Sequence, residues 1–149
     1  MGKINYNWDQ IHEHTNNIID FAEKVGIDTI VGIARGGLPP AVIISNYLDC
    51  QMFTIGIRSY NNNQEQLCIK TTQDLDAGLF EDNKVLIVDD ICDSGKSLHY
   101  IKDMLDSNCK VKEVFTSALF FRQGAMFTPD YYSDFIVDDS WITFPWEKR

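Results

Sequence analysis

Residues 85–97 read VLIVDDICDSGKS, and this stretch decides the fold of the chain. Its first four residues are apolar, as in a buried strand, and they run directly into the carboxylates Asp89 and Asp90. The small and polar residues 94–97 then open a helix. A helix start offers free N–H groups and the positive end of the helix dipole, which suit a phosphate. The sequence therefore sets acidic side chains beside an expected anion-binding loop.

Short apolar strands alternate with amphipathic helices on both sides of this stretch. We expect strands at 29–33, 51–57, 84–89 and 112–120, and helices at about 8–25, 38–48 and 94–106. An Asn7/Gln10 capping box begins the first helix and Gly26 ends it. This alternation predicts an α/β fold with a doubly wound, mostly parallel sheet, whose ligands bind beyond the carboxyl ends of the strands.

The length of 149 residues favours a single domain. We expect a core over about 1–120 and a small aromatic, irregular C-terminal hood over about 121–149. The polar segment 58–80 contains at most a hairpin, with 67–69 as one arm, and its length is typical of a lid or a disordered loop. Segments 34–38, 58–80 and 90–97 should converge on one cleft.

Composition narrows the classes of partner. A net charge of −9 argues against a nucleic-acid surface, so an anionic substrate must be held by local groups. No apolar run approaches the roughly 20 residues that a membrane-spanning helix needs, so we expect no insertion of this chain into a membrane. The cysteines at 50, 68, 92 and 109 lack the spacing of a metal site, and we expect reduced thiols in a cytoplasmic protein.

Two familiar motifs do not fit residues 85–97. A Walker A loop needs glycine where Asp90 stands. A receiver domain begins with its acidic pair and then continues for about the length of a small domain, whereas 59 residues follow Asp90. The chemistry fits better if Asp89 and Asp90 accept hydrogen bonds from a vicinal diol while 94–97 bind phosphate. A diol beside a phosphate is a ribose 5-phosphate.

This order of groups resembles the signature of the type I phosphoribosyltransferases, a hydrophobic strand followed by D-D-x-x-D-[ST]-G-x-[ST]. The resemblance implies 5-phospho-α-D-ribosyl 1-pyrophosphate as a substrate and Mg²⁺ as the cofactor. It implies that Asp89 and Asp90 bind the ribose hydroxyls and the metal, the metal mostly through substrate and water. It gives Asp93 the catalytic position that exchanges a proton with the purine N7. The implied 5-phosphate loop consists of Asp93, Ser94, Gly95, Lys96 and Ser97.

Two further segments extend the resemblance. Residues 32–39, GIARGGLP, resemble the family's pyrophosphate loop, which implies pyrophosphate binding by Arg35, Gly36 and Gly37. A non-proline cis peptide is frequent in that loop and is expected at Arg35–Gly36. Ser59 and Tyr60 open the segment that resembles the family's mobile lid.

The C-terminal motif points to the base. Residues 141–146, WITFPW, resemble the bacterial xanthine-guanine phosphoribosyltransferases, which implies that Trp141 stacks on the purine and that the main chain at Ile142 reads its edge. Arg122 stands where that subgroup has a lysine on the purine 6-oxo group. The chain departs from the subgroup here, because arginine donates hydrogen bonds from a rigid planar group, whereas lysine donates from a compact ammonium on a flexible stem.

The sequence therefore predicts an enzyme of purine salvage, a pentosyltransferase of the glycosyltransferase class. It would transfer ribose 5-phosphate to guanine, xanthine or hypoxanthine and release pyrophosphate and the nucleoside monophosphate. Three alternatives stay open: another or modified base, a non-catalytic regulator that binds the sugar diphosphate or a nucleotide, and an interaction protein with a vestigial pocket. The resemblance also implies a homodimer or homotetramer.

Overall fold

A computed structural model describes residues 2–61, 67–71, 75–108 and 110–147. Its centre is a six-stranded sheet with the strand order β4-β3-β2-β5-β6-β7. All neighbouring strands are parallel except the antiparallel pair β3–β4. This confirms the predicted α/β class. The strands are β2 (Thr29–Ala34), β3 (Gln51–Asn61), β4 (Leu67–Thr71), β5 (Lys84–Cys92), β6 (Glu113–Arg122) and β7 (Tyr131–Ile136).

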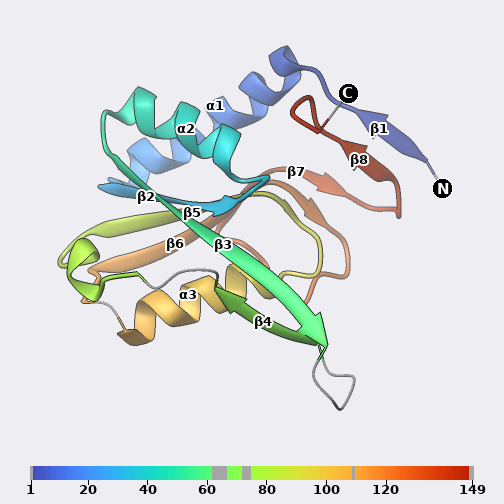
Figure 1. The fold of residues 1–149 in the computed structure, drawn as a ribbon. Helices are drawn as coiled ribbons and strands as arrows, with labels where there is room; N and C mark the ends of the chain where they lie inside the picture. The colour runs from blue at the N-terminus through green and yellow to red at the C-terminus, as the bar shows by residue number, and fades with distance from the viewer. Residues whose placement is uncertain (1, 62–66, 72–74, 109, 148–149) are drawn as a thin grey trace.

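Helices cover both faces of this sheet, as Figure 1 shows. The helices α1 (Trp8–Val25) and α2 (Leu38–Leu48) lie on one face, and α3 (Lys96–Asn108) lies on the other. Two hydrophobic clusters result, one between the sheet and α1 and α2, the other between the sheet and α3. The short 3₁₀ helix η1 (Ala77–Phe80) closes the second cluster with the fully buried Phe80.

Helix α1 has the predicted capping box at its start and the predicted glycine at its end. The Gln10 N–H donates to Asn7 Oδ1, and the Asn7 N–H donates to Gln10 Oε1, each at 2.9 Å. Gly26 ends the helix with a left-handed φ of 76°, which glycine adopts without a steric penalty. The predicted apolar face is buried, with Ile11 and Ile18 at 0% exposure.

The C-terminal region departs from the irregular hood that we expected. β7 joins the main sheet beside β6, and β8 (Trp141–Thr143) pairs in parallel with the N-terminal strand β1 (Lys3–Asn5). Figure 1 shows β1 and β8 side by side near the two chain ends. This pairing could not be predicted from the sequence, because three-residue strands are too short for a periodic pattern and all of β1 is exposed.

Several strands run further toward their carboxyl ends than predicted. β5 continues to Cys92 and β3 to Asn61. The hairpin expected within 58–80 is present as β3 and β4, although 62–66 and 72–74 lie outside the described residues. Within the described chain, no helix has the length and hydropathy to cross a membrane.

Candidate active site

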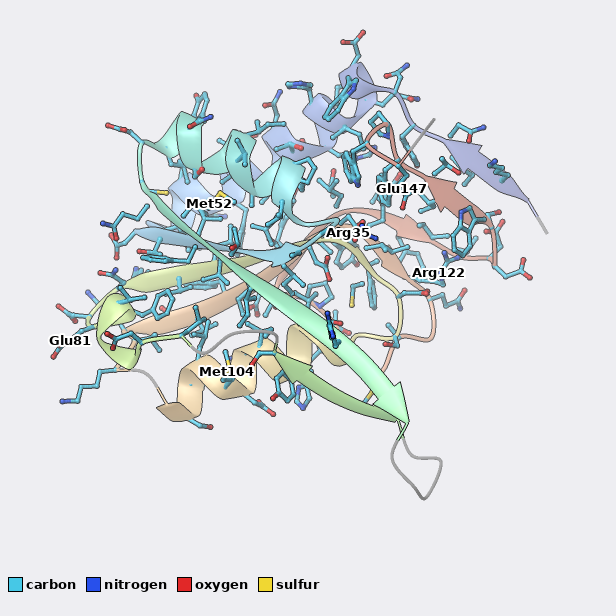
Figure 2. The ribbon with its side chains drawn as sticks, viewed as in Figure 1. Arg35, Met52, Glu81, Met104, Arg122 and Glu147 are labelled. Atoms are coloured by element: carbon cyan, nitrogen blue, oxygen red, sulfur yellow. The ribbon has the colours of Figure 1, made fainter. Side chains whose placement is uncertain are left out.

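The glycine turn after β2 and the acidic loop after β5 meet at the carboxyl ends of these neighbouring strands. Between them lies a pocket of about 640 Å³ lined by Arg35, Gly36, Asp90, Trp146 and Glu147. Figure 2 shows Arg35, Arg122 and Glu147 at this end of the sheet, far from Glu81 at the other end. Segments 34–38 and 90–97 therefore meet as expected, joined by the C-terminal residues, whereas much of 58–80 lies outside the described residues.

The glycine turn needs both of its glycines. A Cβ on Gly36 would fall on the Asp90 carboxylate, and a Cβ on Gly37 would fall on the Val88 carbonyl oxygen. Gly37 is buried and its N–H already donates to the Ile33 carbonyl at 2.9 Å. Of the predicted pyrophosphate loop, Arg35 and Gly36 are thus the residues that line the pocket.

The expected position of the cis peptide bond is wrong. The bond lies between Ala34 and Arg35, one peptide before the predicted Arg35–Gly36 bond. Ala34 is still paired with Gly56 of β3, so the chain leaves the sheet directly at Arg35. The resemblance identified the loop, but it did not show at which residue β2 ends, and so the peptide bond was misplaced by one residue.

Asp89 and Asp90 lie near the carboxyl end of β5. The Asp90 N–H donates to Asp89 Oδ1 at 2.9 Å, and the Ile91 N–H donates to Asp90 Oδ1 at 2.7 Å. Burial raises the pKa of Asp89 well above the ordinary range, and the charge of Asp90 raises it further. Burial also raises the pKa of Asp90, to which the Glu147 carboxylate contributes. Both carboxyl groups therefore keep their protons to a higher pH in the folded chain than they would in water.

The predicted 5-phosphate loop surrounds a smaller pocket of about 70 Å³. Its polar lining is Asp89, Asp93, Ser94, Gly95 and Ser97. Gly95 has a φ of +85°, and the Phe127 backbone lies so close that a Cβ there would stand 2.9 Å from the Phe127 nitrogen. Lys96, by contrast, is exposed outside this lining. Four of the five predicted loop residues are therefore brought together.

Residues behind the loop hold it in place. The Met126 N–H donates to the Ser94 carbonyl at 2.9 Å, and the Cys92 thiol donates to the Phe127 carbonyl at 3.3 Å. Burial raises the pKa of Cys92 to about 12, and the charges of Asp89 and Asp93 add to that rise. The Cys92 side chain is therefore a neutral packing group.

A third pocket, of about 130 Å³, joins the acidic loop to the C-terminal motif. It is lined by Asp90, Ile91, Asp93, Arg122, Trp141, Ile142, Phe144 and Glu147. All three predicted base-binding residues, Arg122, Trp141 and Ile142, are among them. The Trp141 side chain is 63% exposed, whereas Ile142 is buried. An indole with an open face beside polar groups suits a planar ring.

Arg122 connects this pocket to the predicted catalytic carboxylate. Its Nε–H donates to Asp93 Oδ1 at 2.6 Å, in an ion pair where the arginine side chain is 19% exposed. Its terminal nitrogens donate to the carbonyls of Asp138 at 2.6 Å and Ser140 at 3.0 Å. A guanidinium fork and a carboxylate acceptor therefore stand side by side next to Trp141.

The predicted lid residues are only partly described. Ser59 and Tyr60 lie in β3, where their backbones pair with Ile69 and Cys68 of β4. Their side chains lie outside the described residues. The role of this hairpin as a lid stays a prediction.

Sequence reasoning did not assign Phe144, Trp146 and Glu147 to the site, although all three line its pockets. Glu147 contributes a carboxylate to two of the pockets, and its Oε2 accepts from the Phe144 N–H at 3.0 Å. Trp146 stacks on Phe144 with ring centroids 4.6 Å apart and 7° between the planes. Glu147 directly follows the motif at 141–146, and a carboxylate at that position was the available signal.

The acidic residues of the pocket that Arg35 and Gly36 line are suited to Mg²⁺. Asp90 and Glu147 offer hard oxygen donors, and their mutual repulsion would be relieved by a cation. Among the described residues, no group of three or more His, Cys, Asp or Glu is arranged to hold a metal alone. The donor set fits an ion that takes few protein ligands and completes its shell elsewhere.

A strand-end acid pair, a small pocket at a helix start and a pocket beside an exposed indole lie together, an arrangement suited to a sugar phosphate and a planar ring. Comparison with known proteins agrees. Residues 7–148 match the phosphoribosyl transferase domain family. The chain is 34% identical to the xanthine-guanine phosphoribosyltransferase of Cereibacter sphaeroides over 149 residues, which cover 94% of this chain and 84% of that protein.

A solved structure agrees in its fold. The purine phosphoribosyltransferase of Pyrococcus horikoshii superposes with a TM-score of 0.88 at 29% identity, covering 100% of this chain and 96% of that one. The xanthine-guanine-hypoxanthine phosphoribosyltransferase of Helicobacter pylori shares the fold, with a TM-score of 0.77 at 21% identity. This chain belongs to the phosphoribosyltransferase family.

The close approach of Gly36 to Asp90 gives a first prediction. In Gly36→Ala the new methyl group displaces the flexible carboxylate rather than backbone, so the fold survives and the pocket is lost. Isothermal titration should show binding of the Mg²⁺ complex of 5-phosphoribosyl 1-pyrophosphate weakened by roughly tenfold or more. In the control Gly78→Ala, the nearest atom to the new methyl lies at 3.4 Å, an ordinary contact, and affinity should be unchanged. Wild-type affinity in Gly36→Ala would refute this reading.

The raised pKa of Asp89 gives a second prediction. Because the folded-state pKa lies above the unfolded one, the Asp89 carboxyl group lowers the stability of the fold as the pH rises from the unfolded value toward the folded one, and that cost vanishes below the unfolded value. Asp89→Asn should therefore raise the free energy of unfolding at about pH 7, with a smaller gain near about pH 4. Urea titrations at both pH values measure this, with the exposed Asp139→Asn as the control. A variant less stable than wild type at neutral pH would contradict it.

Proposed function

We propose that this chain transfers the ribose 5-phosphate of 5-phospho-α-D-ribosyl 1-pyrophosphate to a 6-oxopurine, giving a purine nucleoside monophosphate and pyrophosphate. Family membership and purine-specific relatives support the reaction class. The observation that carries the choice of base is the Arg122–Asp93 pair beside Trp141.

The pair is complementary to one edge of an oxopurine. That edge carries an acceptor, the 6-oxo oxygen, next to a donor, the N7–H. The Asp93 carboxylate can accept from N7–H, and each terminal nitrogen of Arg122 has a second N–H that can donate to the oxygen. Adenine would instead set its amino N–H against the guanidinium donors, leaving buried groups unpaired. The pair therefore favours guanine, xanthine and hypoxanthine.

The sugar diphosphate would span the remaining pockets. Asp89 and Asp90 accept hydrogen bonds from the ribose hydroxyls, and the 5-phosphate is bound by Ser94, Gly95 and Ser97 at the start of α3. Arg35 and the Gly36 amide face the pyrophosphate. These local donors allow an acidic protein to hold a polyanion.

Magnesium is the cofactor of this proposal. Asp90 and Glu147 would hold it at the pyrophosphate pocket, mainly through substrate oxygens and water. When bound, it supplies positive charge that neutralises the leaving pyrophosphate.

The chain's own residues supply the rest of catalysis. Trp141 and Arg122 hold the base with its reacting nitrogen facing the sugar, which removes much of the orientational entropy of the reaction. The carboxylates of Asp89 and Asp90 stand by a sugar that becomes oxocarbenium-like, as in glycoside chemistry. Asp93 takes the N7 proton. We further propose that the β3–β4 hairpin closes as a lid against water, and that the enzyme acts in the cytoplasm as a homodimer or homotetramer.

Pyrophosphate release from purified protein tests this function. With Mg²⁺ and the activated sugar, guanine, xanthine and hypoxanthine should support turnover, and adenine, uracil and orotate should fall below them by roughly 100-fold in kcat/KM. Asp93→Asn should lower kcat by roughly 100-fold or more. The control Asp103→Asn changes an exposed carboxylate on α3 and should leave the rate unchanged.

The same assay separates the alternatives. Turnover on another base alone would refute the 6-oxopurine assignment. No turnover on any base, with the sugar diphosphate still bound, would refute the enzyme and favour the regulator.

A further inference from the structure

Arg122 contacts two parts of the chain that are far apart in sequence. Its Nε–H reaches Asp93 in the loop after β5, at 2.6 Å. Its two terminal nitrogens reach the carbonyls of Asp138 and Ser140, at 2.6 and 3.0 Å, in the turn before β8. One mostly buried guanidinium therefore ties the catalytic loop to the turn that leads into the base-stacking strand.

That turn controls where Trp141 lies. Because the Trp141 side chain is 63% exposed, little side-chain packing holds it, and its position depends on the backbone. The backbone there is fixed by short contacts: the Ser140 N–H donates to Asp138 Oδ1 at 3.0 Å, and the Trp141 N–H donates to the Gly2 carbonyl at 2.8 Å. Arg122 donates to the Asp138 and Ser140 carbonyls of this turn.

We propose that Arg122 is a positioning residue that sets the distance between the Trp141 stacking face and the Asp93 carboxylate. This rests on the proposed function and adds a second task to the contact with the 6-oxo group. The three acceptors lie in different directions around one planar group, which matches the rigid fork of arginine. A lysine ammonium on a flexible stem reaches the base edge but cannot hold both segments in register.

The proposal predicts that lysine, the residue expected at this position in the xanthine-guanine phosphoribosyltransferases, cannot replace Arg122 in this chain. Arg122→Lys should raise the KM for guanine by roughly tenfold or more, because at least one hydrogen bond to the turn is lost. The KM for the sugar diphosphate should change much less than the KM for guanine. Hydrogen exchange of ligand-free protein should be faster by roughly tenfold in a peptide spanning 137–143. In Arg122→Gly, millimolar guanidinium chloride should partly restore the rate.

The control is Lys102→Met, which breaks an ion pair of 2.7 Å on α3, away from the pockets. It should leave the exchange of 137–143 and the guanine KM unchanged. Unchanged exchange in β5 peptides of the Arg122 variants shows that they are folded. Arg122→Lys with wild-type exchange and a wild-type guanine KM would overturn the proposal. If wild type turned over no base, the proposed function would fail, and the exchange experiment would still decide whether Arg122 holds the turn.

Discussion

The contact between the Gly36 turn and the Asp90 carboxylate is the constraint around which this site is built. It exists because β2 and β5 are neighbours in the sheet and end at the same edge. A side chain at Gly36 would occupy the carboxylate position, and one at Gly37 would meet the β5 backbone. The three pockets of the site all take lining residues from one or both of these strand ends.

The electrostatics of the site follow from the same contact. Asp89 and Asp90 lie beside each other, each partly buried, and both have raised pKa values because the site desolvates them. Such an arrangement destabilises the protein without ligand and favours a ligand that brings hydroxyl donors and a cation. Arg35 and Arg122 each line a pocket that Asp90 also lines, so positive charge lies near the acids in both pockets. The net charge of −9 is compatible with an anionic substrate because these groups act locally.

The core and the acidic loop could be predicted from the sequence because each depends on short-range chemistry. The capping box at Asn7, the apolar residues 85–88 and the glycine at 95 each have one physical explanation, and the structure agrees with it. The pairing of β1 with β8 could not be predicted, since it joins three-residue segments from the two ends of the chain. The partners of Arg122 were hidden for a related reason. They are backbone carbonyls, and a sequence does not reveal which carbonyls a turn will expose. The catalytic, metal-binding and lid roles stay proposals.

The most direct test is a crystal structure of the protein with Mg²⁺, 5-phosphoribosyl 1-pyrophosphate and an unreactive 6-oxopurine analogue. The account predicts ribose hydroxyls on Asp89 and Asp90, the 5-phosphate within 94–97, the pyrophosphate facing Arg35 and the purine on Trp141. A purine bound with its 6-oxo edge turned away from Arg122 and Asp93, or a sugar phosphate bound outside the acidic loop, would contradict it.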